Sequence, residues 1–141
     1  SPERMRYLRR LGGGSLLQKL ARDAIRGAAA VGLLIMPGVT ATDFVIGGRA
    51  LERVWLTATA LQCAFQPMTV LPYLFARQLR GAGEGFSEGE AAVLCELRSR
   101  YLEIFPVTDT RGEIMLFRLF KASPPTARAL RRSVNDILTF H

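Results

Sequence analysis

The sequence has 141 residues, 49% of them hydrophobic, with 19 basic and 12 acidic side chains and a net charge of +7. This length suits a single domain with a real hydrophobic core, and the longest apolar stretch, about residues 28–37, is too short to cross a bilayer. Because the first residues are charged and show no signal-peptide pattern, we expect a cytoplasmic protein that does not contact a membrane.

The first third of the chain predicts two helices followed by a strand. Residues 3–11 and 15–29 have helical patterns separated by three glycines, and Ser15 is placed to cap the second helix. The continuous apolar run VGLLIM at residues 31–36 ends at a Pro-Gly pair, which is typical of a central strand. Residues 40–43 are predicted to form a loop.

Residues 47–70 are the most informative stretch, because a long apolar helix pattern is followed there by a short extended one. The predicted helix covers residues 48–65, and its apolar side chains at helical spacing are Leu51, Val54, Trp55, Ala58, Leu61 and Phe65. Other apolar residues lie on its remaining sides. A helix of this kind must be buried in a large core or between subunits.

A second helix pattern follows this stretch closely. Residues 67–70 are predicted to be extended, and Pro72 suits the first turn of a helix that ends near residue 79. Cys63 and Cys95 lie within helical patterns, and we expect them to be small buried thiols rather than disulfide partners or metal ligands.

The last third of the chain begins with a strong helix-start signal. Ser87, with Glu90 three residues later, is a capping box, and the helix that it starts ends at Pro106. Residues 113–120 have the apolar pattern of a strand. The basic tail at residues 127–140 has apolar side chains at helical spacing.

Long helices outnumber strands, so the predicted class is α+β, mostly helical with a small sheet. Two or three strands are too few for a free-standing sheet with buried central strands, so we expect a partner subunit or a missing segment to complete it. The predicted organisation is a helical lead-in at residues 1–27 and a main domain at residues 28–141.

The sequence offers few residues for direct catalysis. Its single histidine is His141, the last residue, so a Ser-His-Asp or Cys-His arrangement is not expected, and no His, Cys or carboxylate cluster has metal-ligand spacing. The glycine-rich residues 81–85 lack the Lys-Ser/Thr ending and the preceding strand of a phosphate loop. Any catalysis must therefore depend on a cofactor.

Two features fit a bound cofactor. The backbone N–H groups of residues 68–70 follow a helix and have no helical partners, so they could hydrogen-bond a planar ring; an ordinary helix exit explains the same residues. The guanidinium groups of Arg128, Arg131 and Arg132 suit a phosphate group; a solvated basic face of the last helix is the alternative.

Taken together, these stretches resemble the C-terminal half of the nitroreductase family of FMN enzymes, over roughly residues 28–140. The run AVGLLIM at residues 30–36 begins the similarity, and GGRALERVWL at residues 47–56 looks like the long central helix of the family. IMLFRLF at residues 114–120 and ARALRRSV at residues 127–134 look like its last core strand and its closing phosphate motif.

The resemblance implies a site for FMN between two subunits. The family is a homodimer with an α+β fold, in which the central helix, here residues 48–65, lies at the dimer interface. Arg131 matches the arginine that holds the flavin phosphate, with Arg132 beside it. The stretch whose backbone faces the flavin ring matches Pro67, Met68, Thr69 and Val70. Residues 28–141 would then be the C-terminal part of a nitroreductase-like domain.

The implied chemistry is two-electron transfer from NAD(P)H to FMN and then to a small-molecule electron acceptor such as a nitroaromatic or a quinone. Residues 66–75, QPMTVLPYLF, are similar to nitroreductase-like domains joined to an E1-like adenylyltransferase domain in larger bacterial proteins. Because the resemblance covers only half of the family's domain, we expect this segment alone to be inactive.

Three departures from the family pattern favour a second hypothesis, a non-catalytic dimerisation or scaffold domain that has lost FMN binding. The N-terminal Arg-x-Ser-x-Arg element, which supplies most phosphate contacts in the family, does not occur in residues 1–30. Glu52-Arg53 stands where the family often has Gln-Asn, and Ser133 stands in place of the usual proline.

The surplus of basic residues raises a third hypothesis, a nucleic-acid-binding module. Seventeen of the 19 basic residues are arginines, but they are spread from Arg4 to Arg132 and aromatic residues do not alternate with them. Solvated faces, ion pairs, a small anionic ligand or an acidic partner segment explain the charge equally well, so we expect no nucleic-acid partner.

Overall fold

Strand β3 (Gly112–Phe120) is the centre of the sheet. It pairs antiparallel with β1 (Ala30–Met36) on one side and with β2 (Ala64–Pro67) on the other. The computed structural model describes residues 13–123, 132–133 and 136–137. In this part of the chain β1 lies at the sheet edge, so the prediction of a central strand there was wrong, although the strand itself is confirmed.

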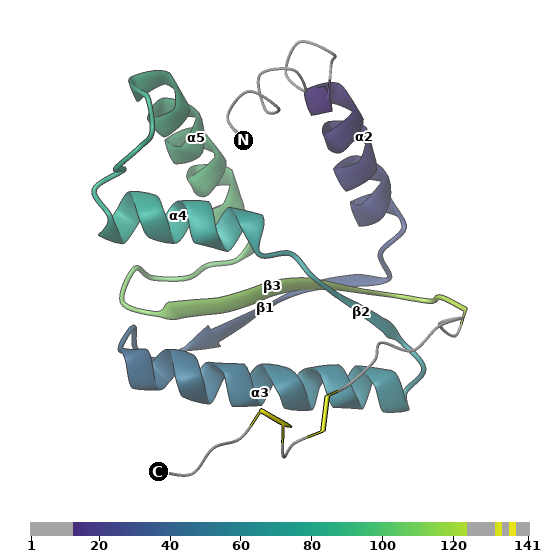
Figure 1. Cartoon of the computed structure of the whole chain (residues 1–141). Helices are drawn as coiled ribbons and strands as arrows, with labels where there is room; N and C mark the ends of the chain where they lie inside the picture. Colours follow the sequence, from purple (N-terminus) through teal and green to yellow (C-terminus); the bar gives the residue numbers. More distant parts are fainter. Residues whose placement is uncertain (1–12, 124–131, 134–135, 138–141) are drawn as a thin grey trace.

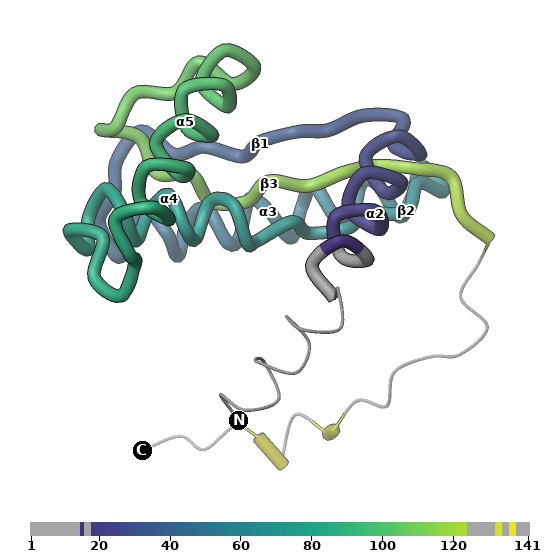
Figure 2. Tube along the Cα trace, turned by 90° about the horizontal axis from the view of Figure 1, so that it is seen from above, coloured from purple at the N-terminus to yellow at the C-terminus, as the bar shows by residue number. Residues whose placement is uncertain are grey.

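Helices cover both faces of the sheet (Figure 1). Helix α3 (Ala41–Ala60) lies under one face, and α2 (Gly13–Arg26), α4 (Val70–Arg80) and α5 (Glu88–Ile104) lie on the other. Figures 1 and 2 show α4 and α5 together over the end where β3 begins and α2 over the opposite end. The predicted α+β class is confirmed as these helices around a small antiparallel sheet.

Helix α3 begins earlier than the sequence predicted. Thr40 and Asp43 form a capping box, and the hydrogen bonds from Thr40 lower the pKa of Asp43. The predicted loop at residues 40–43 was therefore wrong, as was a helix start at residue 48. Gly47 does not open the helix but allows it to approach the sheet, since an added Cβ there would lie 2.5 Å from Cγ1 of Ile114.

Helix α3 also ends earlier than predicted. The amide of Cys63 donates to the carbonyl of Ala58 and that of Gln62 to Thr59, and Gln62 has a φ of 55°. This is a Schellman motif, which stops a helix with one left-handed residue. Phe65 lies in β2 and not in the helix, where its ring stacks between Trp55 of α3 and Phe117 of β3.

The main core lies between the sheet and the pair α4 and α5. Its buried members are Phe75, Leu94, Tyr101 and Leu116. The predicted capping box at the start of α5 is confirmed, because the Ser87 and Glu90 side chains and backbones bond reciprocally. Pro72 in the first turn of α4 is confirmed as well, but Val70 is helical rather than extended.

Helix α2 is attached to the sheet near its C-terminal end. Arg118 of β3 donates from Nη1 to the carbonyl of Ala24 and from Nε to Oε1 of Gln66, at 2.6 Å in the second bond. The helix begins at Gly13, so Ser15 lies inside its first turn and is not the predicted cap.

The cysteines differ from the sequence prediction. Both are free thiols, but Cys95 is exposed on α5 and Cys63 is half-buried. The helical pattern suggested that Cys95 is on the buried face of α5. The buried residues of that helix are instead Leu94, Arg98 and Tyr101.

The left-handed conformation of Gln62 generates a stability prediction. The left-handed conformation costs a residue with a Cβ about 1–2 kcal/mol in steric strain. Glycine avoids this strain, but because it loses more conformational freedom on folding it costs about 0.5–1 kcal/mol. We expect Gln62→Gly to raise the free energy of unfolding by about 0.5–1 kcal/mol, measured by urea denaturation. Ala60→Gly, two residues earlier in the helix, should lower it by about 1 kcal/mol. An equal decrease in the free energy of unfolding for both variants would contradict the Schellman motif at Gln62.

Candidate functional site

A pocket of about 230 Å³ lies between the first turns of α3, one side of α4 and the beginning of β3. Its walls are mostly apolar and aromatic, and Glu113 is the one acidic or basic side chain among the described residues that line it. The lining residues are Phe44, Thr69, Pro72, Tyr73, Ala76, Glu113, Ile114 and Met115. The volume is below the ~300–1,000 Å³ of typical small-molecule sites, so it suits one edge of a ligand.

Helix α4 starts at this pocket without a side-chain cap. Thr69 holds the N-cap position in a helical conformation, and its hydroxyl accepts no cap hydrogen bond. In contrast, α3 and α5 both begin with capping boxes. The first amides of a helix have no partner within the helix, so those of Val70 and Leu71 are left available to an external acceptor.

The predicted ring-facing residues lie around this helix start, with different roles. Pro67 ends β2, Thr69 lines the pocket, and Val70 is exposed in the first turn of α4. Met68 is different, because its amide donates to the carbonyl of Leu116 at 2.7 Å and its side chain packs on the core. Its amide therefore belongs to the sheet and was wrongly predicted to be free.

The predicted phosphate residues are not brought to the pocket by the described part of the chain. Arg131 lies outside the described residues, and Arg132 is exposed. Their role in binding phosphate stays a prediction.

A β-bulge turns Glu113 toward α5. Leu34 pairs with Met115 and Ile35 pairs with Glu113, so Ile114 is an extra residue in β3. In a regular strand residues 113, 115 and 117 would share one face, which here is the α3 face because Phe117 stacks there. The extra residue moves the Glu113 side chain to the opposite face.

Glu113 meets a buried arginine on that face. Nη1 of Arg98 lies 2.5 Å from Oε1 of Glu113, and their side chains are 10% and 12% exposed. The guanidinium also lies over the rings of Phe75 and Tyr101 and 3.6 Å from the exposed carboxylate of Asp109. The pair compensates two charges that would be costly to bury alone.

Tyr101 completes this cluster as a neutral hydroxyl. Burial and the nearby Glu113 carboxylate both raise the pKa of Tyr101, because each disfavours the phenolate. The hydroxyl and Oε2 of Glu113 are buried and make no hydrogen bond within the described part of the chain. The hydroxyl therefore remains a donor and the carboxylate an acceptor.

Sequence reasoning missed the residues of this cluster. Arg98 lies four residues after Leu94 and three before Tyr101, which places a charged side chain on the apolar stripe of α5. Glu113 is the single acidic residue of β3. A charge on a buried helix stripe and an opposite charge in an apolar strand were the signals available to find this pair.

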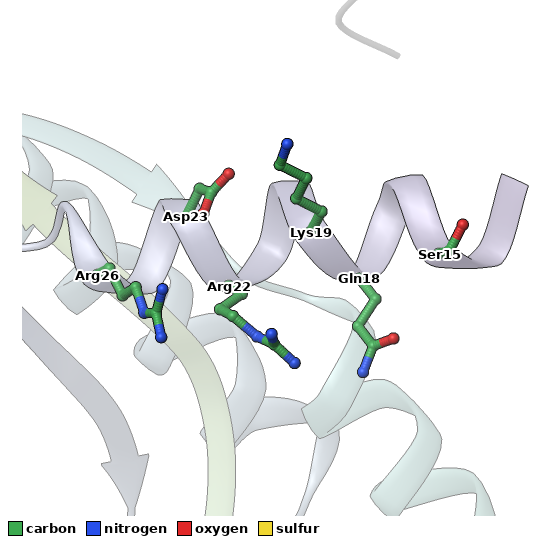
Figure 3. A pocket seen from close by; sticks show the side chains of 6 residues that line it. All are labelled: Ser15, Gln18, Lys19, Arg22, Asp23 and Arg26. Atoms are coloured by element: carbon green, nitrogen blue, oxygen red, sulfur yellow. The ribbon is translucent and has the colours of Figure 1, made fainter.

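A second hollow, of about 320 Å³, lies along α2 but does not form a converging site. All its lining residues come from this one helix (Figure 3). Lys19 and Asp23 point to one side of the helix, whereas Gln18, Arg22 and Arg26 point to the other. The arrangement fits a solvated basic face.

No group of three or more His, Cys, Asp or Glu side chains in the described residues is arranged to hold a metal ion. No helix in the same part of the chain is long and apolar enough to cross a membrane.

Comparison with known proteins places the chain beside one much larger relative. No family model matches it, and no solved structure does. It is 31% identical over 119 residues, or 84% of its length, to "Uncharacterized protein MT1398" of Mycobacterium tuberculosis (strain CDC 1551 / Oshkosh). The matched stretch spans only 16% of that relative. The name of that relative states no activity.

The Arg98–Glu113 pair should dominate the stability of this region. Removing one partner leaves the other charge buried, which costs about 3–5 kcal/mol, so we expect Glu113→Ala to lower the free energy of unfolding by that amount in urea titrations. Glu96→Ala is the control, since the Glu96–Arg100 pair is 66–70% exposed on the same helix and such pairs contribute about 0.5 kcal/mol or less. Similar losses in both variants would show that Glu113 is solvated.

Proposed function

We propose that this chain is part of an FMN-dependent NAD(P)H oxidoreductase of nitroreductase type. The observation that carries the proposal is the uncapped start of α4, which presents first-turn amides beside an apolar pocket at the segment that resembles the flavin-facing stretch. Flavin rings carry carbonyl oxygens and ring nitrogens that accept hydrogen bonds from such amides. Bound flavin would supply hydride and electron transfer; the residues described here would hold and orient it.

The residues fit one edge of a planar ring. Phe44, Pro72 and Tyr73 give the pocket apolar walls, and Thr69, the residue before the uncapped first turn of α4, also lines it. The proposed phosphate contacts are Arg131 and Arg132, by resemblance to the family. A nitroaromatic or quinone acceptor and an attached adenylyltransferase domain belong to the same proposal.

The most direct test of this function is flavin absorbance. The full-length protein, purified and incubated with excess FMN and then freed of unbound ligand, should retain the visible absorption of flavin. Arg131→Ala should reduce the retained FMN about 10- to 100-fold, because a charge-assisted phosphate contact contributes about 1.5–3 kcal/mol. Arg111→Ala, which removes an exposed arginine of the described residues, is the control. No retained FMN in the unmodified protein would contradict the proposal.

We also propose that two copies of the chain pair through α3. Its outer face carries Val45 and Leu56, which are 66% and 63% exposed, with Arg49 and Glu52 between them. Gly48 is exposed, and an added Cβ there would meet nothing within 4 Å. A glycine inside a helix lowers stability by about 1 kcal/mol relative to alanine. No contact within the described residues requires a glycine at position 48, whereas close approach of a second helix would.

The outer stripe of α3 is complementary to itself. In an antiparallel pair of α3 helices with a two-fold axis between residues 50 and 51, Val45 of one copy meets Leu56 of the other. In the same register Arg49 meets Glu52. Neither charge has an ion-pair partner within the described residues. Self-complementarity of one patch is what an isologous dimer requires.

Charge reversal on this stripe tests the dimer. Arg49→Glu places like charges opposite each other and should convert the dimer to a monomer at micromolar concentration, measured by light scattering. Adding Glu52→Arg should restore the dimer, because the opposite charges then meet again. Arg111→Glu, with the same change in net charge, should leave it intact. A monomeric unmodified protein, or no rescue by the second substitution, would contradict this interface.

The same outer face favours a second candidate function, a dimerisation or scaffold domain without FMN. It predicts the dimer and its charge-reversal behaviour but no retained flavin absorbance. The two measurements together therefore separate the candidates.

A further inference from the structure

We infer that the pocket between α3, α4 and β3 binds a small aromatic carboxylate at the end away from Thr69. The ring of the ligand lies against Phe44 and Ala76, and its carboxylate meets the guanidinium of Arg80. The inference goes beyond the proposed flavin function and does not depend on it. Three observations carry it, namely the position of Arg80, its lack of a carboxylate partner among the described residues, and the apolar lining beside it.

Arg80 extends the side of α4 that faces the pocket. Thr69, Tyr73 and Ala76 line the pocket, and residue 80 follows Ala76 by four positions, which places it on the same side of the helix. The uncapped start of α4 therefore lies at one end of this side, and the cation of Arg80, in the last turn, lies at the other.

Two contacts hold the Arg80 guanidinium beside the pocket. Its central carbon lies 5.9 Å from the centre of the Phe44 ring, which is part of the lining. Its Nη2 donates to the carbonyl of Arg111 at 3.4 Å, just before β3 reaches the pocket wall at Glu113. The side chain thus connects α4 with the first turn of α3 and the start of β3, the three elements that form the pocket.

The Arg80 guanidinium can still bind an anion. It is exposed and has no ion-pair partner within the described residues, and its single hydrogen bond leaves most of its N–H donors available. The acidic residues nearest to the lining in sequence are already engaged, Asp43 by Thr40 and Glu113 by Arg98. A carboxylate matches a guanidinium best, because the two form parallel hydrogen bonds.

The lining requires the rest of the ligand to be apolar. Phe44 and Tyr73 offer aromatic surface, and Ala76 adds a small apolar one. The pocket volume of about 230 Å³ is below that of a site for a drug-sized molecule, so it favours a single ring. A carboxylate without an apolar body would leave this surface in water, and a ring without an acid would leave Arg80 unpaired. An aromatic carboxylate satisfies both requirements.

Benzoate and benzamide test this site, since they share a ring and differ in charge. Their binding is followed through the backbone amide signals of the protein in NMR titrations without FMN. We expect benzoate to shift the signals of Phe44 and Ala76 and to bind about 10-fold more tightly than benzamide. Arg80→Gln should abolish this preference. Arg77→Gln is the matched control, because Arg77 lies three residues earlier in α4 but over the Phe86 ring, outside the pocket lining.

Equal affinity for the two probes, shifts confined to residues outside the pocket, or the same loss in both variants would overturn the site. Acetate that shifts Phe44 and Ala76 as strongly as benzoate would overturn it too, because the anion would then bind without the apolar lining. If Arg80→Gln does not fold, as judged by its amide spectrum, the comparison of the probes in the unmodified protein decides. The flavin proposal is tested separately by retained absorbance.

Discussion

The described fold depends on β3 and on the single extra residue within it. This strand is the only one in the described sheet with neighbours on both sides, and helices pack on both of its faces. The bulge at Ile114 decides which face receives each side chain of its first half. On the α3 face the bulge produces an apolar contact, in which Ile114 packs against Gly47. On the opposite face, toward α5, it produces an ion pair between Glu113 and Arg98.

The Ile114–Gly47 contact and the Arg98–Glu113 ion pair position the elements that form the pocket. Close contact at Gly47 holds the first turns of α3, with Phe44, against the beginning of β3. The buried Arg98–Glu113 pair links α5 to the same part of the strand, and α4 packs between α5 and the sheet. A pocket with apolar walls, one carboxylate and one uncapped helix start is therefore supported by the core itself. A rigid support of this kind is what orients a ligand without a cost at the time of binding.

Local signals in the sequence predicted much of the fold. The Ser87–Glu90 capping box, the early proline of α4 and the apolar run of β3 each specify a helix or strand through neighbouring residues alone, and all three are confirmed. The errors have a tertiary origin. Gly47-Gly48 was interpreted as a helix start, because only the contact with Ile114 shows why glycine is needed inside a helix.

The candidate site was predictable only where local sequence signals specify it. Sequence reasoning found the turn before α4, where Thr69 lines the pocket, but not Glu113, whose position depends on a register shift that no local pattern shows. It also treated residues 68–70 as equivalent, although pairing with Leu116 removes the Met68 amide from the set of available donors.

The central claim is that the first amides of α4 face a bound flavin. Hydrogen–deuterium exchange of the full-length protein, with and without FMN, measures this directly, because an amide that donates to a ligand exchanges slowly. The account predicts slower exchange at Val70 and Leu71 when FMN is present, with no change at the capped first turn of α5. Unchanged exchange at Val70 and Leu71 in protein saturated with FMN would contradict it.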